Sequence, residues 1–215
     1  MNRLLIKNIN IINEGIKTSG DIYIEGEFIK KIGVDLTFDN EIKIIDGNGR
    51  IAIPGMIDDQ VHFREPGLTH KGDISSESKA AIAGGVTSYF EMPNTFPNTT
   101  SRKEFKKKIQ IASKNSFANF SFMFGGTNDN IDEIKKLDDK DVAGIKLFLG
   151  SSTGKMLIDN KDSIEKIFKS TSLPISAHCE DEQTIKDNTE YFKNLYGEDI
   201  PCLLYTSPSP RDLRK

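Results

Sequence analysis

The sequence contains no tryptophan, only two cysteines and no apolar run long enough to span a bilayer. Two cysteines are too few for a disulfide framework, so we expect a protein of a reducing, cytoplasmic compartment. The amino terminus lacks the apolar core and the cleavage site of a signal peptide. The formal net charge is -3, with acidic and basic residues interspersed, which indicates neither a nucleic acid nor a membrane as a partner.

The spacing of apolar residues divides the chain into two parts. Residues 1–52 hold short apolar runs, with Gly26 at the turn of an expected hairpin, and predict a small all-β unit. Across 53–200, strand-like and helix-like segments alternate, which predicts an α/β fold with a parallel sheet and helices outside it. A closed barrel of this kind has eight such units in roughly 250 residues, so this part predicts only part of a (β/α)8 TIM-type barrel.

The expected elements of the second part are short and regular. We predict strands at 52–62, 86–92, 117–124, 144–149 and 174–178, and helices at 74–83, 101–113, 131–137, 161–170 and 180–195. Ser101 is the expected N-cap of its helix. We interpret the lysine-rich segment Arg102–Lys108 as a solvated helix face, because a nucleic-acid site needs a wider basic field.

The composition changes at the carboxyl terminus. Cys202–Asp212 has no helical or strand period, and it back-translates to a transposase adapter used in sequencing libraries. We therefore expect 201–215 to be a non-native tail and the chain to be truncated at about residue 201. A genuine disordered tail is the alternative. Genomic DNA beyond the codon for Pro201 distinguishes the two.

Metal-capable and anion-capable side chains gather at the end of the first strand of the second part, in the run Asp-Asp-Gln-Val-His-Phe-Arg-Glu-Pro-Gly. The imidazole of His62 suits zinc, although a lone histidine is more often structural. The amide oxygen of Gln60 is a weak ligand or an orienting hydrogen-bond partner. The guanidinium of Arg64 suits a carboxylate; a surface ion pair with Glu65 is the alternative, and adjacent strand residues point to opposite faces.

Three later strand ends carry further candidates. Asn94, in Met-Pro-Asn-Thr, suits an amide edge, although Asn is also a common turn residue. Lys146 is the one charged residue of an apolar strand, where burying an ammonium is costly unless it is paired or neutralised. A snorkelling cation paired with an acid is the alternative. His178 follows another apolar strand, as His62 does.

This ordered set of motifs resembles the dihydroorotases of the amidohydrolase superfamily. Their first-strand pattern is Asp-x-His-x-His-x-Arg-Glu-Pro-Gly, and here Gln60 replaces the first histidine. Met-Pro-Asn-Thr, the strand-end lysine and the later histidine follow in the same order over about Leu4–Ile200. The resemblance implies that 1–52 form a β-sandwich portion and that 53–200 form the first half of the barrel.

The resemblance also implies a reaction, the reversible cyclisation of N-carbamoyl-L-aspartate to dihydroorotate in pyrimidine biosynthesis. One or two zinc ions would be held by His62, His178 and a carbamylated Lys146, with Gln60 at a weakened position. Arg64 and Asn94 would bind substrate. The family's general acid/base aspartate lies beyond the expected truncation, so no catalytic residue lies within the chain, and we expect the chain as given to be inactive.

Two other functions remain open on the sequence. A related cyclic amidase of the allantoinase or hydantoinase type is one, and Arg64 argues against it because those relatives lack an arginine there. A catalytically inactive scaffold for a partner such as aspartate transcarbamoylase is the other, and its support is Gln60. The resemblance further implies a homo-oligomer.

Overall fold

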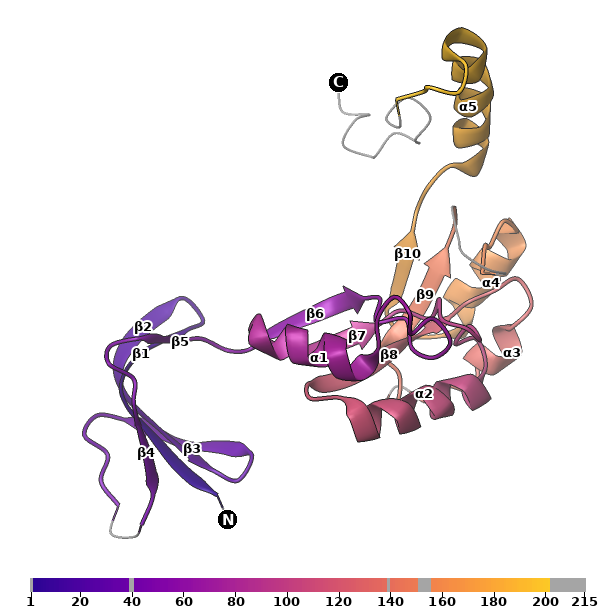
Figure 1. Cartoon of the computed structure of the whole chain (residues 1–215). Coiled ribbons are helices and arrows are strands. Elements are labelled where there is room, and N and C mark those ends of the chain that lie inside the picture. Colours follow the sequence, from indigo (N-terminus) through magenta and orange to yellow (C-terminus); the bar gives the residue numbers. More distant parts are fainter. Residues whose placement is uncertain (1, 39–40, 139, 151–155, 202–215) are drawn as a thin grey trace. The chain divides into compact units, whose positions relative to one another are not determined.

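The computed structural model describes residues 2–38, 41–138, 140–150 and 156–201, and Figure 1 gives the order of the elements. The chain forms two compact units, Met1–Gly55 and Met56–Lys215. The expected non-native tail lies outside the described residues, apart from Pro201. No helix in the described part combines the length and the hydropathy that crossing a bilayer requires.

The first unit is a five-stranded sheet. Its path runs β3 (Phe28–Gly33), β2 (Ile16–Glu25), β1 (Arg3–Asn13) and β4 (Lys43–Asp46), and β5 (Ile51–Ala52) also pairs with β1. Gly26, with a φ of 63°, turns the predicted hairpin between β2 and β3. Leu5, Tyr23 and Leu36 form its small core. The described residues thus contain one sheet of the expected β-sandwich and no second layer.

The second unit is a parallel sheet in the order β6-β7-β8-β9-β10, with each strand beside its neighbour in sequence. The strands are β6 (Met56–Val61), β7 (Val86–Glu91), β8 (Asn119–Gly125), β9 (Gly144–Phe148) and β10 (Ile175–His178). The intervening and following helices are α1 (Ile74–Ala83), α2 (Arg102–Asn115), α3 (Ile131–Ile134), α4 (Lys161–Ser170) and α5 (Glu182–Tyr196). The predicted alternation of strands and helices is confirmed.

Most predicted bounds are close to the observed ones. The helices at 74–83 and 161–170 are confirmed, and Ser101 caps α2 by accepting a hydrogen bond from the amide of Glu104 over 3.3 Å. The strand predicted at 52–62 is wrong in one respect, since it is interrupted between β5 and β6. Pro54 and Gly55 lie at that interruption, and proline cannot donate a ladder hydrogen bond. The helix predicted at 131–137 ends early, at Ile134.

The core of the second unit lies between the sheet and its helices. Phe105 of α2 packs edge-on against Phe122 of β8, with ring centroids 6.2 Å apart. Tyr89 of β7 packs against Phe63, which follows β6, at 4.5 Å. Burial of these aromatic side chains stabilises the strand–helix packing and fixes the start of the loop after β6.

Candidate active site at the strand ends

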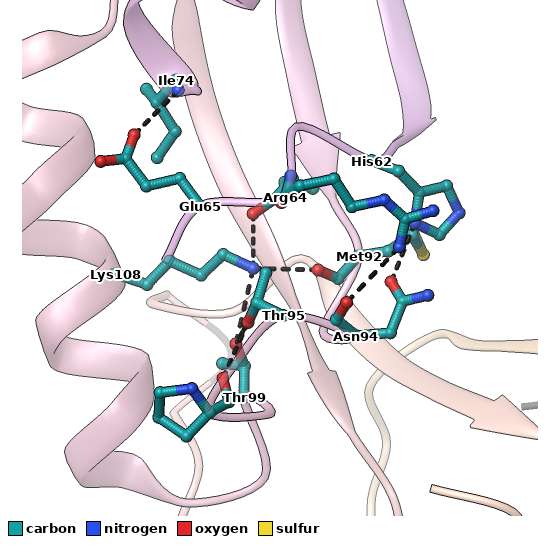
Figure 2. A network of polar contacts seen from close by, with 11 residues as sticks. His62, Arg64, Glu65, Ile74, Met92, Asn94, Thr95, Thr99 and Lys108 are labelled. Carbon is teal, nitrogen blue, oxygen red and sulfur yellow. Dashed lines mark hydrogen bonds and ion pairs between the residues drawn. The ribbon is translucent and has the colours of Figure 1, made fainter. Parts of the chain in front are cut away.

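The loops after β6 and β7 bring three of the predicted residues together (Figure 2). The Nδ1 atom of His62 lies 2.8 Å from Oδ1 of Asn94, and Nη1 of Arg64 lies 3.5 Å from the carbonyl oxygen of Asn94. Because an amide oxygen only accepts, this contact assigns the imidazole proton to Nδ1. The Nε2 lone pair then remains available for a metal, and Asn94 acts as the partner that orients the ring.

The electrostatic surroundings favour the neutral form of His62. Partial burial and the nearby guanidinium of Arg64 lower the pKa of this imidazole, with a further contribution from Lys146, and the hydrogen bond to Asn94 opposes them. The neutral imidazole is the form that binds a metal. The lowered pKa of His62 thus favours the form that the predicted ligand role requires.

Lys146 and Gln60, both predicted at metal positions, contact each other. Lys146 is 3% exposed on β9, and its Nζ donates to Oε1 of Gln60 over 3.1 Å and to Oγ of Ser176 over 3.4 Å. Burial lowers the pKa of this amine, although Cys179 and Asp59 oppose the shift. A lowered pKa increases the share of neutral amine, which is the form that reacts with carbon dioxide.

His178 ends β10, the strand beside β9. Its backbone is in register with Phe148, as Ser176 is with Lys146. The Nε2 atom lies 3.2 Å from Oε2 of Glu180, and 44% of the His178 side chain is exposed. Within the described part of the chain, no hydrogen bond or ion pair joins His178 to His62. The structure therefore brings His62, Arg64 and Asn94 into one group and Lys146 and Gln60 into another, with His178 on the neighbouring strand.

The chemistry of these donors decides whether a divalent metal fits. No three His, Cys, Asp or Glu side chains among the described residues form a metal-binding group. The predicted set instead offers two imidazoles, the amide oxygen of Gln60 and the amine of Lys146. An ammonium offers no lone pair to a metal, whereas a carbamate offers two oxygen donors. The residues present therefore fit a divalent metal on the condition that Lys146 is carbamylated.

The sequence interpretation missed two residues that support this site, Glu91 and Lys108. The interpretation of Arg102–Lys108 as a solvated face is wrong for Lys108, because this residue is 0% exposed. Its position in α2 is three residues after Phe105 and four before Ala112, which are both buried. That helical spacing is the signal that could have placed Lys108 on the inner face of α2.

The buried ammonium of Lys108 forms an ion pair with Glu91, the last residue of β7. It also donates to the carbonyl oxygen of Met92 over 2.9 Å, and Oε1 of Glu91 accepts from the backbone amide of Arg64 over 3.1 Å. Burial raises the pKa of Glu91 to about 7, and Lys108 and Arg64 oppose the shift. Burial likewise lowers the pKa of Lys108.

The loop after β6 is held on its other side by Glu65 and Gly67. Glu65 accepts a hydrogen bond from the amide of Ile74, the first residue of α1, over 2.9 Å, so its carboxylate stabilises that helix end. Within the described part of the chain, Glu65 makes no ion pair with Arg64, which was the alternative interpretation of that arginine. Gly67 has a φ of 84° and lies so close to Phe96 that an added Cβ would be 1.8 Å from its carbonyl oxygen.

Comparison with known proteins gives a consistent picture. A family model described as Dihydro-orotase-like matches residues 49–194. A dihydroorotase of Methanosarcina mazei is 35% identical over 208 residues, covering 95% of this chain and 44% of that protein. An allantoinase of Desulfitobacterium hafniense is 32% identical over 193 residues, covering 87% of this chain and 42% of that protein. The chain thus spans less than half the length of these curated relatives.

Solved structures show the same relationship. An L-hydantoinase (dihydropyrimidinase) from Arthrobacter aurescens has a TM-score of 0.86 and 27% identity, covering 93% of this chain and 45% of that chain. A D-hydantoinase (dihydropyrimidinase) from Thermus sp. has a TM-score of 0.73 and 25% identity, covering 90% and 44%. These enzymes are TIM-barrel amidohydrolases, and the likeness supports the predicted partial barrel.

Proposed function

The chain belongs to the dihydro-orotase-like family, and on that premise we propose that its function is that of a dihydroorotase. The reaction is the reversible cyclisation of N-carbamoyl-L-aspartate to dihydroorotate, a step of pyrimidine biosynthesis. The observation that carries this proposal is the convergence of Arg64, Asn94 and His62 at the ends of two neighbouring strands. The substrate carboxylate needs a cation, its ureido edge needs an amide, and the reacting carbonyl needs a metal held by a ligand such as His62. All three must lie within one small site.

Each residue has a proposed role. Arg64 grips the substrate carboxylate through parallel hydrogen bonds, because its planar guanidinium matches that group. Asn94 holds the ring of His62 and offers its amide to the ureido edge. Zinc held by His62, His178 and carbamylated Lys146, with Gln60 as a weaker neighbour, would polarise the ring carbonyl and activate water.

Further properties of the whole protein belong to the same proposal. We propose a closed (β/α)8 barrel preceded in the chain by a β-sandwich portion, a cytoplasmic location and one or two zinc ions per site. The proposed assembly is a homo-oligomer, and aspartate transcarbamoylase is the proposed protein partner. The described chain supplies ligands and substrate contacts, and no general acid/base is assigned within it.

The similarities to an allantoinase and to hydantoinases favour a second candidate, a cyclic amidase for another ring. Arg64 distinguishes the two, because a ring without a carboxylate gives this guanidinium nothing to pair with. The replacement of a histidine by Gln60 favours a third candidate, a catalytically inactive scaffold.

One experiment tests the three against one another. The complete reading frame that contains this chain is expressed, and the purified protein is assayed with dihydroorotate, allantoin and hydantoin in the presence of zinc. We expect turnover of dihydroorotate alone. Turnover of allantoin or hydantoin in preference to dihydroorotate would establish the second candidate. A folded protein that acts on none of the three contradicts the enzyme proposal and favours the scaffold.

A further inference from the structure

A buried pair of opposite charges lies behind the candidate site. Both Glu91 and Lys108 are 0% exposed, on β7 and α2. Removing two charges from water is costly, and apolar side chains of similar size often serve stability as well or better. Stability alone therefore gives no reason for an ion pair at this place.

The carboxylate of Glu91 holds the loop after β6. Its Oε1 accepts from the amide of Arg64 over 3.1 Å, and the backbone of Arg64 has a φ of 70°. A left-handed conformation is unfavourable for a residue with a Cβ and persists where the surroundings enforce it. The hydrogen bond to a buried carboxylate is such a constraint. It fixes the backbone position of Arg64, from which the side chain with its guanidinium extends.

The ammonium of Lys108 holds the loop after β7. Besides Glu91, its Nζ donates to the carbonyl oxygen of Met92 over 2.9 Å and to Oγ1 of Thr99 over 3.4 Å. Met92 and Thr99 flank the segment that contains Asn94, as Figure 2 shows. The three protons of an ammonium match these three acceptors.

We propose that Glu91 and Lys108 are positioning residues. They hold Arg64 and Asn94 at a fixed position relative to each other and so set selectivity for rings that carry a carboxylate. This inference rests on the proposed function. Neither side chain reaches the substrate, because both are enclosed between β7 and α2. Their effect reaches substrate through the backbone of Arg64 and the loop that carries Asn94.

Two double variants separate this role from a general effect on folding. Glu91→Leu/Lys108→Met removes both charges and also the acceptor for the amide of Arg64. Glu91→Gln/Lys108→Met removes both charges but retains an amide oxygen in the same place. Lys107→Met is the matched control, because Lys107 is the exposed neighbour of Lys108 on α2. All are made in the complete reading frame and compared by thermal unfolding before assay.

The KM for dihydroorotate is expected to rise on the order of tenfold in the Leu/Met variant, with kcat changed much less, because a hydrogen bond to a charged group is lost. The Gln/Met variant should recover the part of that loss that comes from the amide of Arg64, because both variants lack Lys108 and only the acceptor at position 91 differs. Dihydrouracil, which lacks the carboxylate, should not distinguish the two. Equal KM values in two folded double variants overturn the inference. If the Leu variant does not fold, Glu91→Gln/Lys108→Met is compared with the Lys107→Met control instead. Its KM should be the higher of the two, because Met92 and Thr99 lose the donor that holds their loop, and equal KM values overturn the inference.

Hydrogen exchange keeps this test independent of the proposed function. If the folded parent does not turn over dihydroorotate, the proposed function fails while the positioning role is still measured at the amide of Arg64. Exchange there should be on the order of tenfold faster in the Leu/Met variant than in the Gln/Met variant. Equal exchange rates overturn the positioning role whatever the activity of the parent.

Discussion

The side chains of Gln60 and Lys146 meet across the parallel sheet, with Nζ of Lys146 3.1 Å from Oε1 of Gln60. Their strands, β6 and β9, are separated in the sheet by β7 and β8. A flat sheet would hold these side chains far apart, because neighbouring strands are spaced about 4.8 Å apart. The sheet is therefore curled, and its inner surface brings residues 86 positions apart in the sequence into contact.

This contact predicts how the metal content responds to substitution. Gln60→His should raise the zinc bound per chain, because imidazole is a stronger donor than an amide oxygen and Lys146 also loses its hydrogen-bond acceptor. Elemental analysis after dialysis against zinc-free buffer measures the zinc. Intact mass spectrometry reports the added mass of one carbon dioxide on Lys146. Gln110→His, on the exposed side of α2, is the control, and equal zinc in both variants contradicts the prediction.

Substitution of Arg64 tests carboxylate recognition directly. Arg64→Lys keeps the charge but loses the planar pair of donors, so kcat/KM for dihydroorotate should fall on the order of tenfold or more. The kcat/KM for dihydrouracil, which lacks the carboxylate, should change little. Steady-state kinetics with both rings gives the comparison, and Arg102→Lys on α2 serves as the control. A parallel loss with both rings would mean that Arg64 does not read the carboxylate.

The close approach of two loops predicts an unequal effect of two glycine substitutions. Gly67 and Gly85 have φ values of 84° and 89°, so alanine at either position should cost about 1–2 kcal/mol of backbone free energy. An added Cβ at Gly67 would lie 1.8 Å from the carbonyl oxygen of Phe96, whereas Gly85 has open space. Gly67→Ala should therefore cost about 1–3 kcal/mol more, measured as the free energy of unfolding in urea. Equal losses of unfolding free energy in the two variants would show that the loop of Phe96 shifts to accommodate the added methyl group.

Alkaline pH should destabilise the chain through Tyr89. Burial raises the pKa of this phenol to about 12, from 10.0. A raised folded-state pKa gives stability that is complete below pH 10 and is lost as the pH rises toward 12. Tyr89→Phe should flatten the dependence of the unfolding free energy on pH in this window. Tyr191→Phe is the control because Tyr191 is 60% exposed, and the same slope in both variants counts against the prediction.

Much of the fold was predictable because local signals agreed with the tertiary packing. The helix of α1 is bounded by Asp73, whose side chain accepts from the amide of Ser76 over 2.8 Å, and by Gly84. Such caps act within a few residues, so they can be read directly from the chain. The β1–β2 hairpin was not predicted, although its turn holds a local signal: Gly15, with a φ of 76°, follows Glu14, with a φ of 50°.

The sequence by itself determined the alternation of strands and helices and the order of the polar motifs, because hydrophobic periodicity and capping are local properties. From these came the prediction that His62, Arg64 and Asn94 lie at neighbouring strand ends. Only the tertiary structure decided that Lys146 contacts Gln60 and that Lys108 is buried against Glu91. Those contacts depend on the curl of the sheet and on the face that α2 turns inward, and both are set by packing between distant segments.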